Sequence, residues 1–313
     1  MKERYPTLAI LILFFSVNSP AATNFTEDCH ALLQSKLPST TLSYAELQPS
    51  ALVGAGKNSA LTGASANQEK VGKHCLVTGV IGARRGVDNR EYGTHFELRM
   101  PENWNGGFLF QGGGGMDGVV APAVGGIPFH NSTARPALNR GYAVVSMDGG
   151  HQGNNADFGT DQAARIDYAY ASIGKVTSVA KALINSFYHS SPGKSLFMGC
   201  SNGGREAMIA AQRYPNEFDG IIAGNPGFRL SKASLGQAWD TQQLIKIAPP
   251  NAQGKPILAN ALAPQDLNLV SRAVLAACDA KDGIKDGLIN NWVSAELPGE
   301  ALFSFADHHI PRQ

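Results

Sequence analysis

Short apolar runs, each bounded by glycine or other turn residues, recur through the middle of the chain. They predict strands, because continuous or alternating apolar residues over about four to eight positions are typical of buried or half-buried strands. The runs cover residues 75–81, 94–100, 108–110, 141–146, 195–198 and 220–224.

Residues 163–189 have a helical period, with apolar positions that fall on one face of a helix. That face consists of Ile173, Val176, Val179, Ala180, Leu183, Ile184 and Phe187. Strands and helices alternate along this part of the chain. The order favours an α/β fold with a mostly parallel sheet covered by helices on both faces.

Two regions lack the alternation of strand and helix. Residues 31–73 are polar, rich in small residues and weakly periodic, which predicts an irregular N-terminal layer. After Pro226 the chain predicts two helices, over residues 230–247 and 264–278, joined by a proline-rich connection. We therefore expect a second domain over residues 229–313.

The motif with the most chemical content follows the apolar run at 195–198. Gly199-Cys200-Ser201-Asn202-Gly203 fits Gly-x-Ser-x-Gly, the nucleophile elbow of α/β-hydrolases. The small residues let a strand and a helix approach closely, so that a strained turn lifts the serine hydroxyl to the positive end of the helix. The alternative is a glycine-rich turn without chemistry. An apolar strand before the motif, an amphipathic helix after it and a further strand favour the elbow.

Four consecutive glycines, Gly112 to Gly115, follow the run at 108–110. In α/β-hydrolases the loop after this strand supplies one oxyanion N–H, and the residue after the nucleophile supplies the other. These donors would be Gly113 or Gly114 and Asn202. A flexible loop is the alternative. A phosphate-binding loop is disfavoured, because no Gly-Lys-Ser/Thr follows.

The segment around Ser201 resembles the tannase and feruloyl esterase family, whose hallmark is a cysteine directly before the nucleophile, here Cys200, and two glycines after it. Residues 218–226 are also similar to the strand that follows the elbow in that family, and the resemblance extends from about Cys29 to about Ile289. It implies an α/β-hydrolase fold with an inserted lid domain. The implied activity is that of a secreted serine ester hydrolase acting on esters of aromatic (phenolic) acids, such as feruloyl or galloyl esters.

The resemblance also bears on the four cysteines, which by themselves allow three full pairings. It implies a disulfide between Cys29 and Cys75. In the family the cysteine before the nucleophile pairs with one next to the catalytic histidine, but no cysteine follows Cys278 here. We therefore expect Cys200 and Cys278 to be unpaired.

A loop with three aspartates and two glycines occupies residues 279–288. Calcium takes about 6–8 oxygen ligands, and carboxylates with backbone carbonyls could supply them. A solvated Asp/Gly loop is the alternative. The resemblance implies a structural calcium site in the lid, whose ligands are the side chains of Asp279, Asp282 and Asp286 and the carbonyls of Ile284 and Leu288.

Composition and charge exclude some classes of partner. The 313 residues are 43% hydrophobic, and the formal net charge is +1 with no basic run. This predicts no binding to nucleic acid or to an anionic membrane surface. Lys2 and Arg4 precede an apolar run over residues 8–17 that is too short for a comfortable membrane span. Residues 1–22 are therefore predicted to be a signal peptide, without a membrane anchor, which implies a secreted or periplasmic protein.

The histidines do not complete a catalytic triad. His95 is expected on a strand face, and His151 precedes the nucleophile, whereas the base of an α/β-hydrolase follows it. After Ser201 only His308 and His309 occur, beside Asp307. The resemblance implies that the acid, the base and the last two core strands belong to a further C-terminal part of the family's sequences. We therefore expect an incomplete core over residues 23–228, without the acid and base and without the last core strands. The alternative is a non-catalytic secreted calcium-binding or carbohydrate-associated module, or a pseudoenzyme fragment.

Overall fold

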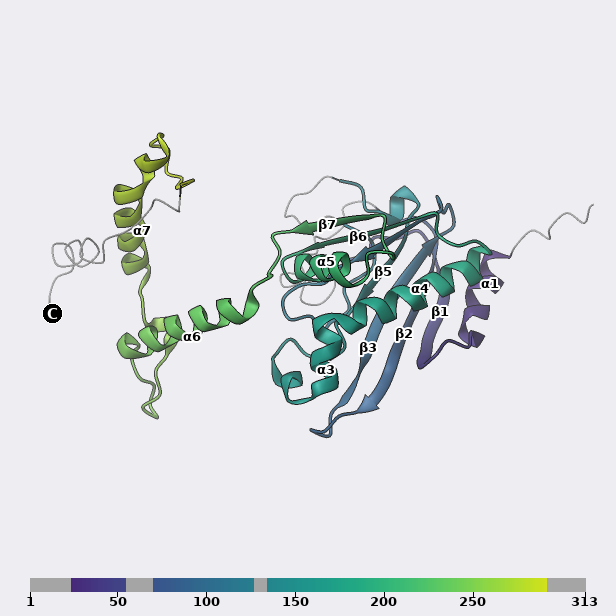
Figure 1. The fold of residues 1–313 in the computed structure, drawn as a ribbon, viewed down its shortest axis with the longest axis horizontal. Coiled ribbons are helices and arrows are strands. Elements are labelled where there is room, and N and C mark those ends of the chain that lie inside the picture. Colours follow the sequence, from purple (N-terminus) through teal and green to yellow (C-terminus); the bar gives the residue numbers. More distant parts are fainter. Residues whose placement is uncertain (1–23, 55–69, 127–133, 292–313) are drawn as a thin grey trace, which may run out of the picture. The chain divides into compact units, whose positions relative to one another are not determined.

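The computed structural model describes residues 24–54, 70–126 and 134–291. The chain divides into two units, Met1–Phe228 and Arg229–Gln313. The first unit holds a seven-stranded sheet in the order β1-β2-β3-β5-β4-β6-β7 (Figure 1). The strands are β1 (Thr40–Gln48), β2 (His74–Arg85), β3 (Glu91–Pro101), β4 (Gly107–Gln111), β5 (Ala143–Met147), β6 (Lys194–Cys200) and β7 (Gly220–Gly224).

Five of the seven strands point the same way. β5, β4, β6 and β7 pair in parallel, whereas β1, β2, β3 and β5 pair antiparallel in succession, so β2 also points with the parallel group. The predicted mostly parallel α/β sheet is confirmed. All five residues of β4 and of β5 are buried, because strands covered on both faces have no solvent side.

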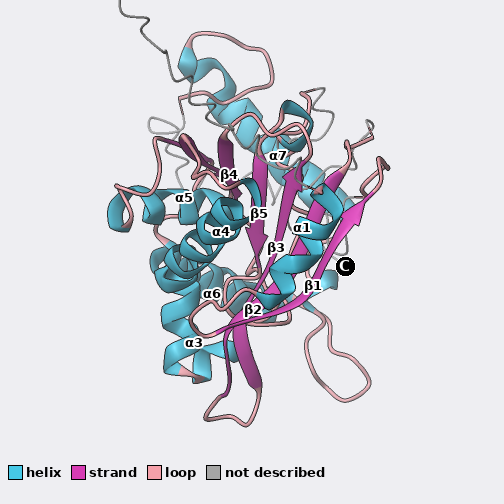
Figure 2. Cartoon of the chain, turned by 90° about the vertical axis from the view of Figure 1, so that its right-hand side faces the viewer, coloured by secondary structure: helices cyan, strands magenta, loops and turns pink. Residues whose placement is uncertain are grey.

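One face of the sheet is covered by α1 (Phe25–Ala31), α4 (Ser172–Tyr188) and α5 (Asn202–Arg213), which Figures 1 and 2 show in front of the strands. Every residue of the apolar face predicted for α4 is buried. Phe110 of β4 stacks on Phe197 of β6 with ring centroids 4.7 Å apart. These rings belong to the same core cluster as the buried residues of the three helices.

The opposite face is covered differently from the prediction. Its apolar cluster joins Leu109 and Val144 of the strands to Val124 and Leu138. These last two residues come from a connection whose described regular structure is the short turn η2 (Leu138–Arg140). In the described part of this connection, loop backbone and small side chains therefore replace a packed helix.

The expectation of an irregular layer over residues 31–73 is wrong in part, because β1 lies within it. The strand escapes pattern analysis because it is an edge strand in which only Ala45 is buried. Its other positions alternate between half-buried and exposed only from Thr40 to Tyr44, and the alternation then changes phase, so its apolar residues follow no single period of two. Hydrogen bonds to β2 hold it, and its register shifts between Leu42 and Tyr44.

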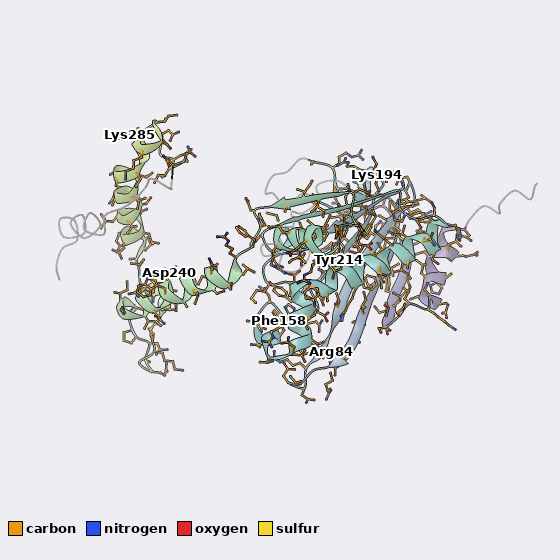
Figure 3. The ribbon with its side chains drawn as sticks, viewed as in Figure 1. Arg84, Phe158, Lys194, Tyr214, Asp240 and Lys285 are labelled. Carbon is orange, nitrogen blue, oxygen red and sulfur yellow. A yellow bond between two sulfur atoms is a disulfide. The ribbon has the colours of Figure 1, made fainter. Side chains whose placement is uncertain are left out.

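The helix predicted over 163–189 is divided into α3 (Gln162–Ile166), the π-helical turn η4 (Asp167–Ala171) and α4. Asp161 caps α3 by accepting a hydrogen bond from the Ala164 N–H at 2.8 Å. Asp161 also accepts two hydrogen bonds from the Arg84 guanidinium, which holds the pKa of that carboxyl well below its usual range. Figure 3 places Arg84 and Phe158 near α3, at the same end of the first unit.

The second unit contains α6 (Leu230–Ile247) and α7 (Pro264–Cys278), with the predicted bounds, and the turns η5 (Leu258–Asn260) and η6 (Asp279–Asp282). The turns η1 (Leu32–Gln34) and η3 (Asp157–Thr160) belong to the first unit. In the part of the chain that the structure describes, no helix combines the length and apolar character needed to cross a membrane. The predicted signal peptide, residues 1–22, lies outside the described residues.

The predicted disulfide is present between Cys29 of α1 and Cys75 of β2, and Cys200 and Cys278 are free. The bridge joins residues 46 positions apart. Closing a loop of this length stabilises a fold by about 4 kcal/mol in the chain-entropy description. We expect a Cys29→Ser/Cys75→Ser variant to lose stability of this order in urea unfolding followed by circular dichroism.

The matched control is Cys200→Ser, which removes a thiol that is in no bridge. Its unfolding midpoint should stay close to that of the unchanged protein. Equal midpoints for the unchanged protein and the double variant would show that the bridge does not restrain the folded unit.

Candidate active site

The serine of the elbow lies where β6 ends and α5 begins. Ser201 has φ 58° and ψ −116°, a strained conformation for a residue with a side chain, and it is exposed. A Cβ added to Gly199 would lie 2.8 Å from the Cα of Gly203, and one on Gly203 would lie 2.6 Å from the carbonyl oxygen of Gly113. Only glycine permits these approaches. The predicted elbow geometry is therefore formed by the backbone.

The backbone N–H groups around Ser201 differ in what they bind. The Gly112 N–H donates to the Met198 carbonyl at 2.8 Å, and the Gly113 N–H donates to Glu206 Oε2 at 2.9 Å. The N–H of Gly114 and that of Asn202, the first residue of α5, have no hydrogen-bond acceptor within residues 24–54, 70–126 and 134–291. Of the two glycines named from the sequence, Gly114 thus carries the free donor and Gly113 is engaged.

A polar cluster lies beneath the elbow, around the side chain of Asn202. The Asn202 Nδ2 donates to Asp117 Oδ1, and the Asn202 Oδ1 accepts from Arg205 Nε at 2.6 Å and from the Tyr168 hydroxyl at 3.1 Å. The Arg205 guanidinium also lies over the Tyr168 ring, 4.4 Å from its centroid. Burial raises the pKa of Tyr168 to about 12. The tyrosine is therefore a neutral donor at ordinary pH.

Two acids complete this cluster, and sequence reasoning missed both. Asp117 is 3% exposed and Glu206 is 1% exposed. Burial, and then the neighbouring Glu206, raise the pKa of Asp117 well above its usual range. A charged Arg205-Glu206 pair directly after the glycines of the elbow, where α5 must pack on the sheet, is the signal that could have identified Glu206.

A histidine–aspartate pair lies at the same end of the sheet as Ser201, but not beside it. His95 Nδ1 is 2.8 Å from Asp148 Oδ2, and this hydrogen bond raises the pKa of His95. His95 belongs to β3, which is three strand positions from β6. At about 4.8 Å per position, the separation of the strands is roughly 14 Å. His95 thus occupies the strand position predicted from the sequence, out of hydrogen-bonding reach of Ser201.

His151 is in the interior, 1% exposed. It stacks on Phe158 with ring centroids 3.9 Å apart, and neither ring nitrogen makes a well-formed hydrogen bond. Burial lowers its pKa, although Asp148 and the backbone of Met116 favour the charged form. His151 is therefore a neutral packing residue. Asp307, His308 and His309 lie outside the described residues.

The aspartate loop of the second unit is folded around backbone N–H groups. Asp279 Oδ1 accepts from the N–H of Gly287 at 3.0 Å and from that of Asp286 at 3.3 Å. Asp282 accepts from Ile284 and Asn290 through different oxygens, and Asp286 from Leu288. No three His, Cys, Asp or Glu side chains converge as a metal site in the described ranges. Carboxylates are the kind of donor that calcium takes. In this arrangement, however, most of these carboxylate oxygens accept hydrogen bonds from backbone N–H groups of the loop.

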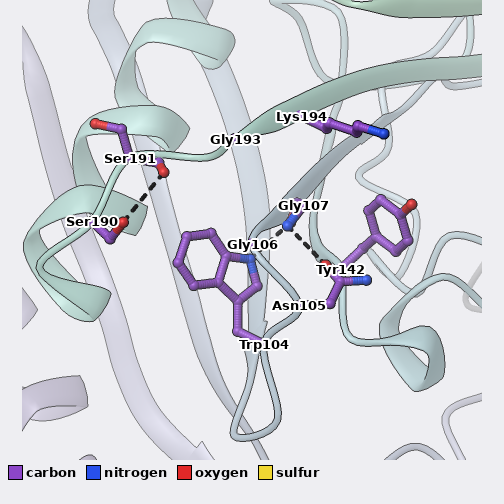
Figure 4. Close-up of a pocket in the computed structure, with 9 residues that line it drawn as sticks. All are labelled: Trp104, Asn105, Gly106, Gly107, Tyr142, Ser190, Ser191, Gly193 and Lys194. Carbon is purple, nitrogen blue, oxygen red and sulfur yellow. Dashed lines mark hydrogen bonds between the residues drawn. The ribbon is translucent and has the colours of Figure 1, made fainter.

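A pocket of about 550 Å³ lies between the start of β4 and the start of β6 (Figure 4). Trp104, Tyr142 and Lys194 are among its lining residues. Because Ser201 follows the other end of β6, the pocket is roughly 20 Å from the serine along the strand, at about 3.3 Å per residue. It is separate from the elbow.

Comparison with known proteins supports what the elbow indicates. A family model described as "Tannase and feruloyl esterase" matches residues 75–302. Mono(2-hydroxyethyl) terephthalate hydrolase of Piscinibacter sakaiensis is 41% identical over 239 residues, 73% of this chain and 39% of the relative. A probable feruloyl esterase B-2 of Aspergillus flavus is 30% identical over 94% of this chain and 53% of its own length.

Solved structures with a similar fold include a feruloyl esterase, as the sequence relatives do. The crystal structure of feruloyl esterase B from Aspergillus oryzae matches with a TM-score of 0.67 at 23% identity, over 89% of this chain and 51% of that chain. The present chain spans about half the length of the curated relatives it matches. With the family model covering most of the chain and ester hydrolases as its relatives, this chain belongs to the tannase and feruloyl esterase family of carboxylic ester hydrolases.

Proposed function

We propose that this protein is a serine ester hydrolase in which Ser201 forms an acyl-enzyme. The observation that carries the proposal is the strained, exposed Ser201 beside two N–H groups, those of Asn202 and Gly114, that have no acceptor among the described residues. Donors that are fixed before the reaction stabilise the oxyanion without reorganisation, which is the largest contribution in many acyl-transfer enzymes.

The chemistry is attack of Ser201 Oγ on the ester carbonyl carbon. The Oγ proton passes to a base, the carbonyl oxygen becomes an oxyanion held by the two N–H groups, and the alcohol leaves with a proton. Water then attacks the acyl-enzyme and releases the acid, which restores the serine. The positive end of α5 adds a favourable potential at the oxyanion.

The base is the part of this mechanism that the described residues do not supply. A serine hydroxyl is a weak nucleophile unless a base accepts its proton within hydrogen-bonding reach. Among residues 24–54, 70–126 and 134–291, no histidine is hydrogen-bonded to Ser201. Positioning and oxyanion stabilisation can therefore be separated from full turnover by experiment.

The substrates we propose are esters of aromatic acids, such as feruloyl, galloyl or related phenolic esters. The support is the names of the relatives, which include feruloyl esterases, and a terephthalate monoester hydrolase as the relative with 41% identity. In all these esters the carbonyl is conjugated with an aromatic ring, directly in galloyl and terephthalate esters and through a carbon–carbon double bond in feruloyl esters. A small-molecule ester or a plant-polymer fragment could present this group to Ser201, in a protein that we expect to be secreted or periplasmic.

The test of this proposal uses methyl ferulate and p-nitrophenyl acetate with the 313-residue chain. Because no described base reaches Ser201, we expect turnover near background, lower than that of an intact triad by about 10⁴–10⁶. A fluorophosphonate should still label the protein slowly, at Ser201 alone, as read by intact mass and peptide mapping. Fusing the C-terminal part of a family member to the chain should restore fast turnover.

Ser201→Ala in the fused protein is the control and should remove both turnover and labelling. Turnover that survives Ser201→Ala would reject the serine mechanism. A fused protein that folds but neither turns over nor takes the label would favour the alternative of a calcium-binding module without catalysis.

We further propose a structural calcium ion at the aspartate loop, held by Asp279, Asp282 and Asp286 with the carbonyls of Ile284 and Leu288. Three carboxylates and two carbonyls are the hard oxygen donors that calcium prefers, and glycines at 283 and 287 adopt positive φ, which lets the loop turn sharply. Binding would require the carboxylates to exchange some of their N–H partners for the ion.

This proposal predicts that calcium raises the melting temperature and that EDTA lowers it, because an ion bound only by the folded state stabilises that state. At a calcium concentration 100-fold above Kd, the gain should be about 2.7 kcal/mol. Asp282→Asn should abolish the difference, whereas Asp240→Asn on α6 should leave it unchanged. Identical melting curves with calcium and with EDTA would exclude the site.

A further inference from the structure

The two buried acids under the elbow connect the two segments that carry the free N–H groups. Glu206 belongs to α5 and accepts the Gly113 N–H through Oε2. Asp117 follows the glycine loop and accepts the Asn202 side-chain amide through Oδ1. Each acid therefore binds the segment to which the other belongs.

The remaining oxygen of each acid, Asp117 Oδ2 and Glu206 Oε1, accepts no hydrogen bond from the described residues. The two carboxyl groups nevertheless meet at Gly113: its N–H donates to Glu206 Oε2 at 2.9 Å, and a Cβ built on it would collide with Asp117 Oδ2. The proximity of Glu206 adds to burial in raising the pKa of Asp117. Two carboxylates cannot hydrogen-bond to each other unless one of them carries a proton, because both would only accept. A single proton held by the pair lets one carboxyl group donate to the other and leaves one negative charge between them.

The charged groups around the pair favour one negative charge in total. Arg205 is 3.9 Å from Glu206 Oε1 and favours an ionised carboxylate, while Asp148, directly after β5, disfavours a second one. Tyr168 contributes a neutral hydroxyl, and His151 packs against the Tyr168 ring as a neutral imidazole. With both acids almost fully buried, one shared proton leaves a monoanion facing one guanidinium.

We propose that Asp117 and Glu206 share one proton and act as a buried strut, which holds the glycine loop at residues 112–115 against the first turn of α5. The strut fixes the separation of the Gly114 and Asn202 N–H groups. Asp117 and Glu206 are thus positioning residues for the oxyanion donors rather than catalytic residues. This inference rests on the proposed serine ester hydrolase function for its consequence, but the shared proton and the strut can be tested without activity.

The sharpest test is a set of amide replacements. In Asp117→Asn the new NH₂ can donate to Glu206 while the amide oxygen still accepts from Asn202. In Glu206→Gln the new NH₂ can donate to Asp117 while the amide oxygen still accepts from Gly113. Each single variant therefore replaces the shared proton. In the double variant two NH₂ groups face each other, or one amide rotates and loses its outer partner.

We expect the melting temperature of each single amide variant to lie within a few degrees of that of the unchanged protein. If the two single shifts added, they would set an expected melting temperature for the double variant, and we expect the observed value to lie roughly 5 °C below it. If both acids were ionised, each amide would relieve repulsion and the double variant would be the most stable of the set. That outcome, or strict additivity, overturns the shared proton. Asp157→Asn, at an exposed surface acid, is the matched control.

The shared proton also has a pH signature. The folded pair keeps a proton that the unfolded chain releases above about pH 4, so stability should fall as pH rises from there toward the raised pKa of Asp117. Asp117→Asn cannot ionise and should lack this loss. The difference in melting temperature between Asp117→Asn and the unchanged protein should therefore increase from pH 4 upward. A constant difference overturns the proposal.

The positioning role of the strut is tested by hydrogen exchange at the Gly113 N–H and by the rate at which Ser201 is labelled. Hydrogen exchange at the Gly113 N–H should be slow in the unchanged protein and in Asp117→Asn, and at least about tenfold faster in Asp117→Ala. At 25 °C, with all variants folded by circular dichroism, fluorophosphonate labelling of Ser201 should be about tenfold or more slower in Asp117→Ala than in Asp117→Asn. Equal labelling rates in these two variants would overturn the positioning role.

These results separate the two proposals. If the unchanged protein takes no label but the amide set and the Gly113 exchange behave as expected, the strut stands and the serine hydrolase function fails. If Ser201 is labelled but the double amide is additive and Gly113 exchange is unchanged, the function stands and the strut fails.

Discussion

The approach of three backbone segments at Ser201 is the constraint on which the rest of the first unit depends. The end of β6, the first turn of α5 and the glycine loop after β4 meet where added Cβ atoms would collide. Side chains cannot fill such a junction, so the hydrogen bonds of its peptide groups must be made elsewhere or left for a ligand. The strained conformation of Ser201 persists because all three segments are fixed by their neighbours.

The rigidity that holds this strain comes from the core beneath the sheet. Phe197 of β6 stacks on Phe110 of β4, and Phe218 meets Phe197 edge-on with centroids 5.4 Å apart. Asp219 accepts the Ser195 N–H at 2.7 Å and ties the approach of β7 to the start of β6. Burial of large aromatic groups stabilises by several kcal/mol in total, which exceeds the roughly 1–3 kcal/mol of one strained residue.

Much of this arrangement could be predicted from the sequence, since it is encoded locally. The apolar runs of β4, β5 and β6 and the helical face of α4 are period signals, and the Gly-x-Ser-x-Gly motif fixes the turn by steric exclusion. β1 was missed for a physical reason, because only one of its residues is buried and the register shift between Leu42 and Tyr44 changes the phase of its alternation. The π-helical turn before α4 was also missed, because Asp167 and its neighbours continue a helical spacing through it.

The polar cluster could not be predicted, because its members become neighbours only through the tertiary fold. Asp117 and Glu206 are 89 positions apart in the chain. The place of Glu206 after the elbow glycines could indicate its burial but not its partner, and Asp117 stands in no pattern that separates a buried acid from a solvated one. Their pairing depends on the glycine loop lying against α5. The same packing that removes side chains from the oxyanion donors also creates a water-poor volume below them, and a charge placed there must be shared or neutralised. A protonated acid pair is thus a consequence of forming an oxyanion site from backbone N–H groups alone. The base that would activate Ser201 is a separate requirement, which this packing does not meet.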